Sequence, residues 1–360
     1  MRIIQLLPIL SYGDAVGNDA IALHNALKKA GYKAGLYASV VDNRLPAGLA
    51  KSVDDIGIIA EEDLIIYHLS TGHVLNDYIK SVPGIKVIVY HNITPSEYFS
   101  GYKMEAELAC KNGRKALKEL AQYADYAIAD SEYNKLELIE NGYQCPIEVL
   151  PILIPFEDYE SKVDRGIIKK YKDNYTNILF TGRVVPNKKH EDLIDTFYYY
   201  KKFINPKSRL ILVGSFAGID LYHNELEAYV KELGLEDVVF TGHIKFNQIL
   251  AFYKCADVFL CMSEHEGFCV PLIEAMYFDL PIVARDTSAI AGTLNGSGLL
   301  LEDSNPIVAA EMINKIITDS NLKTEVIENQ KKRLMDFDNG IVENQFLKIV
   351  NGIVRSHDIP

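Results

Sequence analysis

The chain of 360 residues has no tryptophan and few cysteines. The five cysteines are odd in number and scattered, and none forms a C-x-x-C pair. This pattern fits neither a disulfide framework nor a zinc site of the usual spacing, so we interpret the cysteines as small buried apolar residues in a reducing compartment. They are Cys110, Cys145, Cys255, Cys261 and Cys269.

Long apolar segments and a secretion signal are also missing. No run of about 18 apolar residues occurs, which argues against a membrane-spanning helix. The first residues, 1–8, are too few for the apolar region of a signal peptide and lack a cleavage-like end, so we expect a cytoplasmic protein. The net charge of −12 argues against nucleic acid as a partner, because phosphate backbones attract basic surfaces.

One local basic cluster departs from this acidic balance. The segment 104–122 has helical spacing and carries Lys111, Arg114, Lys115 and Lys118 close together. Such a face is compatible with peripheral contact at the inner face of the cell membrane. It is also compatible with an ordinary solvated helix face, which is the interpretation that we prefer.

Short apolar runs alternate with helical patterns along the whole chain. This alternation is typical of βαβ units and parallel sheets, so the fold class is predicted to be α/β. The predicted strands cover residues 2–9, 33–40, 64–69, 86–91, 126–129, 177–181, 209–213, 238–241, 258–262 and 281–284, and the main predicted helices cover 19–30, 73–81, 104–123, 191–203, 221–233, 247–254, 271–277 and 306–317.

The alternation pauses near residues 150–155, where two prolines bracket an apolar link. The length fits two domains, which we place at 1–154 and 155–340. Each is predicted to be a doubly wound, Rossmann-like parallel sheet, and ligands of such sheets lie beyond the carboxyl ends of the strands. We therefore expect the two domains to face a central cleft.

The most informative stretch follows the predicted strand at 258–262. A polar loop with Glu266 and Gly267 leads to Pro271, which we place at the first position of a helix. Free backbone N–H groups and the helix dipole make such a turn an anion site. Glu266 and Glu274 flank it, and their carboxylates are suited to sugar hydroxyls beside a diphosphate. The alternative is that Glu274 only complements the helix dipole and Glu266 is solvated.

A second basic motif lies between a predicted strand and a predicted helix, at residues 180–189. Arg183 offers a planar fork of donors and Lys188 a point charge, and together they can neutralise a diphosphate. Lys189 competes with Lys188 for this role, but the spacing favours Lys188. Basic residues at a helix start are unfavourable for the dipole, which argues against a purely structural role.

The segment 266–276 resembles the E-x7-E segment of retaining glycosyltransferases of family 4, which have the GT-B fold. The resemblance implies that Glu266 contacts the donor sugar near the reaction centre and that Glu274 binds the ribose hydroxyls. Arg183 and Lys188 stand in a Gly-Arg-(four residues)-Lys segment that holds the leaving diphosphate in this family. The commonest version has a small residue where Cys269 stands.

Two features of the first domain also match the family. In residues 13–18 two glycines occupy the first strand–helix turn, and Gly17 best matches a glycine loop that lies opposite the donor. By itself this signal is weak, because many turns contain two glycines. His91 ends a predicted strand and resembles the histidine placed next to the transferred sugar. A lone histidine is more often a structural residue, so this alternative stays open.

The resemblance implies further donor contacts in the second domain. They involve Ile244 near the base, and the loop residues Gly267, Phe268, Cys269 and Val270. With His91, Glu266, Arg183 and Lys188 in catalytic roles, these residues and Glu274 complete the predicted site.

One loop departs from the family pattern, and one motif resembles the metal signature of a different glycosyltransferase fold. The family usually has Pro-Glu where Ala291 and Gly292 stand, so no role is carried over to that loop. Asp336 and Asp338 form a D-x-D, the metal signature of the other major glycosyltransferase fold. They precede an Asn-Gly turn pair, and we interpret them as capping carboxylates. We therefore expect no metal and no other cofactor.

The resulting prediction is a retaining, metal-independent hexosyltransferase of the bacterial polysaccharide type. Its donor would be a GDP-, UDP- or dTDP-hexose, and its acceptor a glycan or a lipid-linked glycan. Two alternatives remain, a GT-B sugar-nucleotide 2-epimerase, which needs no acceptor, and a non-catalytic sugar-binding protein. The amphipathic stretch 341–354, within the final segment 341–360, would cross back to the first domain, or else pack as a simple terminal helix on the second.

Overall fold

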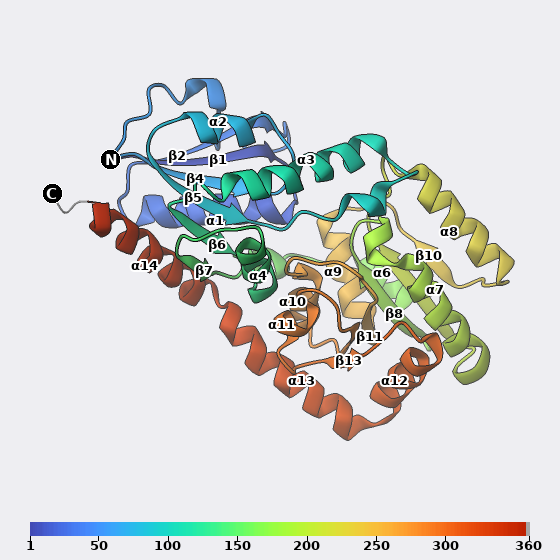
Figure 1. The fold of residues 1–360 in the computed structure, drawn as a ribbon. Helices are drawn as coiled ribbons and strands as arrows, with labels where there is room; N and C mark the ends of the chain where they lie inside the picture. Colours follow the sequence, from blue (N-terminus) through green and yellow to red (C-terminus); the bar gives the residue numbers. More distant parts are fainter. Residues whose placement is uncertain (358–360) are drawn as a thin grey trace. The chain divides into compact units, whose positions relative to one another are not determined.

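The computed structural model describes residues 1–357, which form two compact units (Figure 1). Of the described residues, the first unit comprises 1–97, 105–155 and 337–357, and the second comprises 98–104 and 156–336. Residues 358–360 of the predicted final segment lie outside the described residues. Among residues 1–357, none of the helices is both long and apolar enough to cross a bilayer.

The first unit is built on a parallel sheet of seven strands in the order β3-β2-β1-β4-β5-β6-β7. Its strands are β1 (Ile3–Leu10), β2 (Ala34–Val41), β3 (Lys51–Ser52), β4 (Leu64–Leu69), β5 (Ile85–Tyr90), β6 (Tyr126–Ala129) and β7 (Ile147–Val149). Its helices are α1 (Ala15–Lys29), α2 (Leu75–Ser81), α3 (Met104–Leu120), α4 (Glu132–Glu140) and α14 (Asn339–His357), with 3-10 turns η1 (Val53–Asp55) and η2 (Ser96–Phe99).

Alternate side chains of each strand point to opposite faces of this sheet, and helices pack against both faces. On one face, strand residues such as Ile66 and Val87 pack with Leu23 of α1 and Phe346 of α14. On the other face, strand residues pack with apolar side chains of α2, α3 and α4. The sheet is therefore doubly wound, and α14 belongs to the core of the first unit.

The second unit has a parallel sheet of six strands in the order β10-β9-β8-β11-β12-β13. The strands are β8 (Thr176–Thr181), β9 (Ser208–Val213), β10 (Val238–Phe240), β11 (Val258–Cys261), β12 (Ile282–Arg285) and β13 (Leu299–Leu301). The helices are α5 (Phe156–Tyr159), α6 (Arg165–Tyr171), α7 (His190–Tyr199), α8 (Asp220–Glu232), α9 (Phe246–Cys255), α10 (Val270–Tyr277), α11 (Ile290–Leu294), α12 (Pro306–Thr318) and α13 (Ser320–Leu334). Short turns are η3 (Pro186–Lys188), the π-helical η4 (Tyr200–Ile204) and η5 (Met335–Phe337).

The elements missing from the sequence-based prediction are mostly short. Strands β3, β7 and β13 have two or three residues each and lie at sheet edges. Such strands carry too few apolar residues for a recognisable pattern, and their extended form depends on pairing with a neighbour. The single helix predicted over 191–203 is an α-helix only to Tyr199 and continues as the π-helical turn η4.

Candidate functional site

Two loops of the second unit meet at the carboxyl ends of adjacent strands. Strands β8 and β11 pair in parallel, so the loop after Thr181 and the loop after Cys261 lie side by side. The backbone N–H of Glu264 donates to the carbonyl of Asn187 over 2.9 Å, and the Asn187 amide donates to the carbonyl of His265 over 3.0 Å. Asn187, which the sequence did not mark, thus holds the two predicted motifs together.

An ion pair joins the two motifs directly. Lys188 Nζ lies 2.6 Å from Glu266 Oε1, and both side chains are largely shielded from solvent. Burial lowers the pKa of Lys188, but the charge of Glu266 and its hydrogen bond more than offset this, so the net direction is upward. The lysine is therefore held as a cation beside a fixed carboxylate.

The other two basic residues of the motif differ from Lys188. Lys189 has a left-handed backbone, with φ of 51°, and pairs with Glu264 at 3.2 Å and with Glu191 at 3.6 Å. Arg183 is exposed, and its side chain has no hydrogen bond or ion pair within residues 1–357. Of the two lysines, Lys188 is thus the one beside Glu266, while Arg183 is free to take an anionic ligand.

A third loop, after β12, fixes the backbone of Glu266. Ser288 has φ of 49°, and its hydroxyl accepts the Glu266 N–H over 2.8 Å. Thr287 donates to the carbonyl of Ser263 over 2.6 Å. The sequence predicts no role for this loop, because the loop departs from the family pattern. Its hydroxyl residues nevertheless hold the Glu266 loop in place.

Helix α10 begins one residue earlier than the sequence predicted. Val270 is the first helical residue, so Pro271 occupies the second position, where its missing N–H is still one of the unpaired groups. Cys269 caps the helix with φ of 72°, a left-handed conformation that costs a non-glycine residue about 1 kcal/mol. Gly267 and Val270 are half-buried, whereas Phe268 is buried and its carbonyl accepts from Thr293 over 2.5 Å.

Glu274 lies half-buried in α10 with two tyrosines on its carboxylate. Tyr159 donates to Oε1 over 3.0 Å, and Tyr253 donates to Oε2 over 2.7 Å. Burial raises the pKa of Glu274, and the two hydroxyls partly oppose that shift. Tyr253 also lies 2.5 Å from the Thr181 hydroxyl at the end of β8. Neither tyrosine was predicted, because nothing in their local sequence relates them to Glu274.

Close backbone contact shapes the edge of the same site. A Cβ added to Gly214 would lie 1.8 Å from the carbonyl oxygen of Gly182, so only glycine fits after β9. Gly214 also bridges to Gly242, which precedes the half-buried Ile244 by two residues. Ile244 therefore lies in the loop between β10 and α9. This loop follows the carboxyl end of its strand, as the loops described above do.

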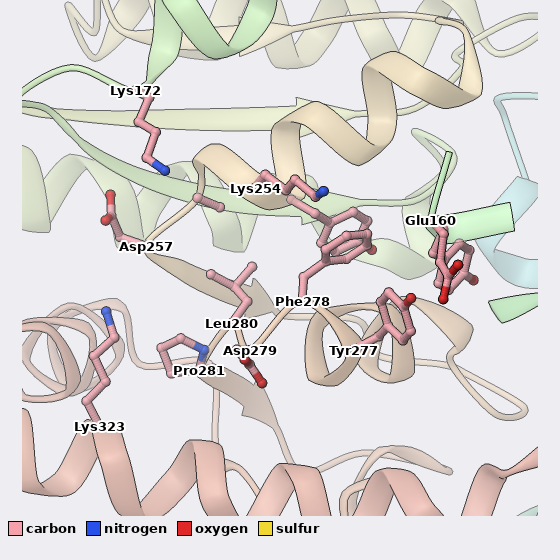
Figure 2. A pocket seen from close by; sticks show the side chains of 13 residues that line it. Glu160, Lys172, Lys254, Asp257, Tyr277, Phe278, Asp279, Leu280, Pro281 and Lys323 are labelled. Atoms are coloured by element: carbon pink, nitrogen blue, oxygen red, sulfur yellow. The ribbon is translucent and has the colours of Figure 1, made fainter. Parts of the chain in front are cut away.

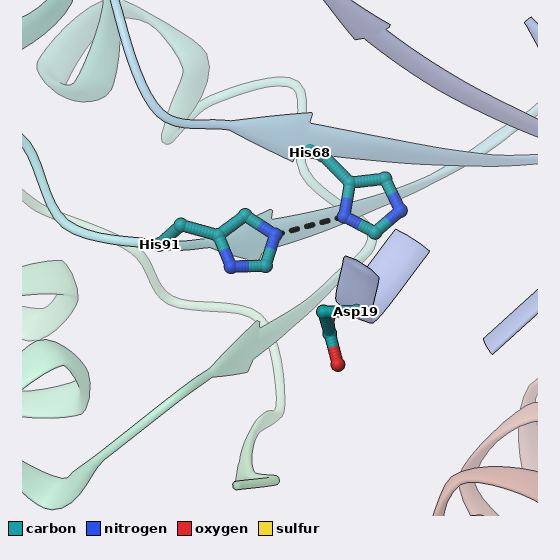
Figure 3. A group of neighbouring side chains, drawn as sticks. All are labelled: Asp19, His68 and His91. Atoms are coloured by element: carbon teal, nitrogen blue, oxygen red, sulfur yellow. Dashed lines mark hydrogen bonds between the residues drawn. The ribbon is translucent and has the colours of Figure 1, made fainter. Parts of the chain in front are cut away.

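His91, in the first unit, is hydrogen-bonded to His68, and Asp19 lies close to both rings (Figure 3). The His91 ring has no exposed area, and Nδ1 lies 2.9 Å from Asp130 Oδ2. Its Nε2 lies 2.8 Å from Nδ1 of His68, and the planes of the two rings are nearly parallel, with an angle of 6° between them. His91 as a whole is half-buried, so its exposed part is the backbone.

The hydrogen bonds of His68 and His91 determine which ring nitrogens carry a proton when both imidazoles are neutral. Gln5 Nε2, a donor, lies 3.3 Å from His68 Nε2, so the His68 proton is on Nδ1 and points to His91. The proton of neutral His91 is then on Nδ1, which donates a hydrogen bond to Asp130. Burial and the neighbouring His91 lower the pKa of His68 well below its ordinary value. Burial also lowers the pKa of His91, but the charge and hydrogen bond of Asp130 outweigh it and raise the net value.

Gly17 lies in the first turn of α1, not in the preceding loop as predicted. Its N–H is 3.3 Å from the carboxylate of the N-cap residue Asp14. An added Cβ would lie 3.0 Å from the carbonyl oxygen of Ser11, so this glycine permits close packing of the helix start on β1. Gly17 and His91 belong to the first unit and the other predicted site residues to the second.

A cavity of about 560 Å³ lies elsewhere in the second unit (Figure 2). Asp257 and Pro281, which line it, directly precede β11 and β12, so it opens at the amino ends of the strands. The Lys188–Glu266 pair lies at the carboxyl ends. Tyr253 lines the cavity and also contacts Glu274. The cavity thus lies at the strand ends opposite the Lys188–Glu266 pair, but it adjoins Glu274 through Tyr253.

The D-x-D motif lies at a helix start. Asp338 Oδ1 accepts the N–H of Ile341 over 3.2 Å in the first turn of α14, and Asp336 pairs with Arg333 at 2.7 Å. The prediction of a capping carboxylate is confirmed for Asp338 but is wrong for Asp336, and Asn339 and Gly340 are the first residues of α14, not a turn.

Part of the second unit is similar to a known protein family. Residues 164–333, which contain every predicted site residue of the second unit, match the family model described as Glycosyl transferases group 1.

Several curated proteins with assigned activities are similar to this chain. An alpha-1,4-N-acetyl-D-galactosaminyltransferase of Campylobacter jejuni, whose name gives an undecaprenol-diphosphate-linked glycan as substrate, is 28% identical over 48% of this chain and 47% of its own length. The capsular polysaccharide biosynthesis glycosyltransferase CapM of Staphylococcus aureus is 26% identical over 69% and 62%. The O-antigen chain mannosyltransferase RfbU of Salmonella typhimurium is 32% identical over 59% and 56%. The chain thus spans about half to three fifths of these relatives' lengths.

Solved structures resemble almost the entire chain. Sucrose-phosphate synthase from Thermosynechococcus elongatus is 18% identical, with a TM-score of 0.75 over 99% of this chain and 100% of its own. The Anabaena protein HepE in complex with UDP-glucose is 21% identical, with a TM-score of 0.74 over 98% and 100%. These similarities concern the fold, and they confirm the predicted GT-B architecture of two parallel α/β domains.

Proposed function

We propose that this chain is a retaining glycosyltransferase that moves a hexose from a nucleoside diphosphate sugar to a glycan or lipid-linked glycan. The observation that carries the proposal is the Lys188–Glu266 pair, 2.6 Å apart, at the carboxyl ends of two neighbouring strands. It lies beside the start of α10, in the segment that matches the glycosyltransferase model. A cation, a helix start and a fixed carboxylate are together suited to a sugar diphosphate.

Lys188 and Arg183 would stabilise the leaving nucleoside diphosphate. As the bond between the anomeric carbon and the phosphate oxygen breaks, negative charge accumulates on the phosphate, and preorganised donors then lower the barrier. Arg183 is exposed and unpaired, so it can reach a ligand without losing a protein partner. Lys188 would be shared between Glu266 and the phosphate.

Glu266 would face the transferred sugar and Glu274 the ribose. Lys188 and the Ser288 hydroxyl fix Glu266 from two sides. Glu274 has one tyrosine hydroxyl on each oxygen, which leaves further acceptor capacity on both for ribose hydroxyls.

The chemical step would occur on one face of the sugar. The acceptor oxygen forms a bond to the anomeric carbon on the side from which the phosphate departs. The acceptor proton passes to the leaving phosphate oxygen, so no covalent sugar–enzyme intermediate is formed. The transfer needs no metal in this proposal, because the basic pair and the helix start supply the positive charge.

Both ring nitrogens of His91 have partners inside the first unit. Nδ1 is hydrogen-bonded to Asp130 and Nε2 to His68. We therefore propose that His91 acts at the sugar through its exposed backbone and that the buried ring keeps this segment in position.

The relatives suggest which substrates to test first. HepE structures contain UDP and UDP-glucose, so UDP-hexoses are the first donors, followed by GDP- and dTDP-hexoses. The Campylobacter relative supports an undecaprenol-diphosphate glycan as the first acceptor. A thermal-shift panel of these donors should raise the melting midpoint only for the cognate one.

Product analysis then separates the proposed activity from its alternatives. We expect a glycoside with retained anomeric configuration, formed only when donor and acceptor are both present. A changed sugar nucleotide with donor alone would instead indicate an epimerase. Binding without turnover in all combinations would contradict an enzymatic function.

A further inference from the structure

Two thiols and a carboxylate converge in the segment that leads from the end of β11 to the start of α10. Cys261 is the last residue of β11, Cys269 caps α10, and Glu266 lies between them in the loop. All three residues are buried, and their ligating atoms lie within 4.8 Å of one another. Cys269 is one of the predicted donor contacts, but the proposed transfer reaction gives no chemical role to either thiol group.

We propose that Cys261, Glu266 and Cys269 bind one thiophilic divalent metal ion, with Zn²⁺ as the representative. Thiolate sulfur and carboxylate oxygen are ordinary ligands of Zn²⁺. Zn–S bonds of about 2.3 Å in a tetrahedral site place two sulfur atoms about 3.8 Å apart, within the observed spread. Three protein ligands leave the fourth position for water.

Charge balance favours this site, because Lys188 is already next to it. The ammonium of Lys188 lies 2.6 Å from the Glu266 carboxylate and would remain beside a bound ion. A divalent ion, two thiolates, one carboxylate and one ammonium group sum to zero charge. A buried group that stays neutral avoids the desolvation cost of an uncompensated charge.

The thiols also lack strong competing partners. Cys261 Sγ lies 3.5 Å from the Ser263 hydroxyl, and the two thiols are hydrogen-bonded to each other. Thiols are weak donors and acceptors, so metal binding sacrifices little. The cluster of Asp19, His68 and His91 differs, because its imidazoles already satisfy each other and Asp130.

The sequence did not predict this site, because seven residues separate the two cysteines. A bend at Gly267 and the positive φ of Cys269 bring the second thiol back to the end of β11. Glycine suits such a backbone better than cysteine does. Cys269→Gly therefore removes a ligand without straining the loop, and Cys261→Ser removes the other with a nearly isosteric side chain.

The test is a titration of the reduced full-length protein with Co²⁺, followed by displacement with Zn²⁺. We expect one Co²⁺ per chain, with a thiolate-to-cobalt charge-transfer band, release of about two protons, and loss of the band when Zn²⁺ is added. Cys261→Ser and Cys269→Gly should each weaken binding by more than about 100-fold, the upper range for loss of a mere supporting contact. Cys255→Ser, which changes another buried cysteine of the same unit, should bind like the wild type.

Other outcomes would overturn the proposal. They are absence of the charge-transfer band, or a band that persists in both Cys261→Ser and Cys269→Gly. Melting curves of these variants show whether they are folded, and a folded Cys269→Gly protein that binds Co²⁺ normally contradicts the site.

Bound metal should also inhibit the proposed transfer, because it engages Glu266. This consequence rests on the proposed function, whereas metal binding itself does not. Stoichiometric Zn²⁺ should suppress turnover at least about 10-fold in the wild type and leave Cys261→Ser unaffected, and a chelator should restore the rate. Equal inhibition of both proteins would contradict the link. Absence of turnover with every donor would count against the proposed function and would leave the Co²⁺ result intact.

Discussion

Lys188 and Glu266 are 78 positions apart in the chain, yet the ammonium of one donates a hydrogen bond of 2.6 Å to the carboxylate of the other. The pairing of β8 with β11 brings them together. The basic motif and the acidic motif of the sequence thus form one site, in which a cation and a carboxylate hold each other in place.

Removal of Arg183 or Lys188 should slow turnover more than it weakens donor binding. Both side chains would act on charge that develops in the transition state, so we expect kcat to fall about 10²–10³-fold for Arg183→Ala and for Lys188→Ala. The double variant should lose less than the product of the two factors, because both residues act on one diphosphate. Steady-state kinetics with the best donor measures this.

Lys189→Ala is the matched control for these variants. Lys189 pairs with Glu264 and Glu191, not with Glu266, so kcat should stay close to the wild-type value. A severe loss in Lys189→Ala alone would mean that the register of the basic motif is wrong by one residue. Normal rates in both Arg183→Ala and Lys188→Ala would place the diphosphate elsewhere.

Glu274→Ala should weaken nucleotide binding more than it lowers kcat, since ribose contacts are made in both ground and transition states. The substitution also leaves the Tyr159 and Tyr253 hydroxyls without their acceptor, so unfolding free energy should fall by about 1–3 kcal/mol. Calorimetry with the nucleotide measures affinity. Tyr159→Phe, which removes only one hydroxyl, serves as the control, and unchanged affinity in folded Glu274→Ala would contradict the assignment.

Turnover should survive removal of divalent metal. Asp338 caps α14 and Asp336 pairs with Arg333, so these carboxylates already have structural partners. Saturating EDTA should therefore leave the rate nearly unchanged, or raise it if inhibitory Zn²⁺ was bound. Loss of activity in EDTA that Mg²⁺ or Mn²⁺ restores would overturn the metal-independent mechanism.

Asp19 should make the stability of the first unit depend on pH. Burial, aided by the charge of Asp130 and opposed by that of His91, raises the pKa of Asp19 to about 7. In the unfolded chain the carboxyl ionises near its ordinary value of about 4. The folded group binds its proton more tightly, so its stabilising effect is complete below about pH 4 and is lost as pH rises to about 7.

Asp19→Asn tests this dependence and preserves the hydrogen bond from the Leu153 N–H, because the amide oxygen can still accept it. The stability of the wild type relative to this variant should fall by up to about 4 kcal/mol between pH 4 and pH 7. Melting midpoints of both proteins across this range measure the difference. Parallel pH profiles would contradict the raised pKa.

Gly214→Ala should severely disturb the packing of the backbone after β9 against Gly182 and Arg183. The new methyl group would overlap the Gly182 carbonyl at 1.8 Å, and both partners are backbone, so the cost should be at least about 3 kcal/mol. Gly292→Ala is the control, because its added Cβ meets no atom within 4 Å. Denaturant unfolding compares the two, and equal stability would show that the loops adjust freely.

The α/β class, the main strands and the positions of the charged motifs could be predicted from the amino-acid sequence. Apolar periodicity and turn residues are local signals, so they survive without knowledge of the fold. Even the start of α10 was predicted to within one residue, from Pro271. The edge strands β3, β7 and β13 were not predicted, since their pairing comes from neighbours distant in the chain.

The contacts between side chains of distant elements depend on the tertiary structure and could not be predicted. Strand order sets β8 beside β11, and this brings Lys188 to Glu266 and Asn187 to the same loop. The two tyrosines on Glu274 and the burial of the His91 ring depend equally on packing between distant elements. Local periodicity shows which face of an element is buried, but not which residues of other elements it will contact.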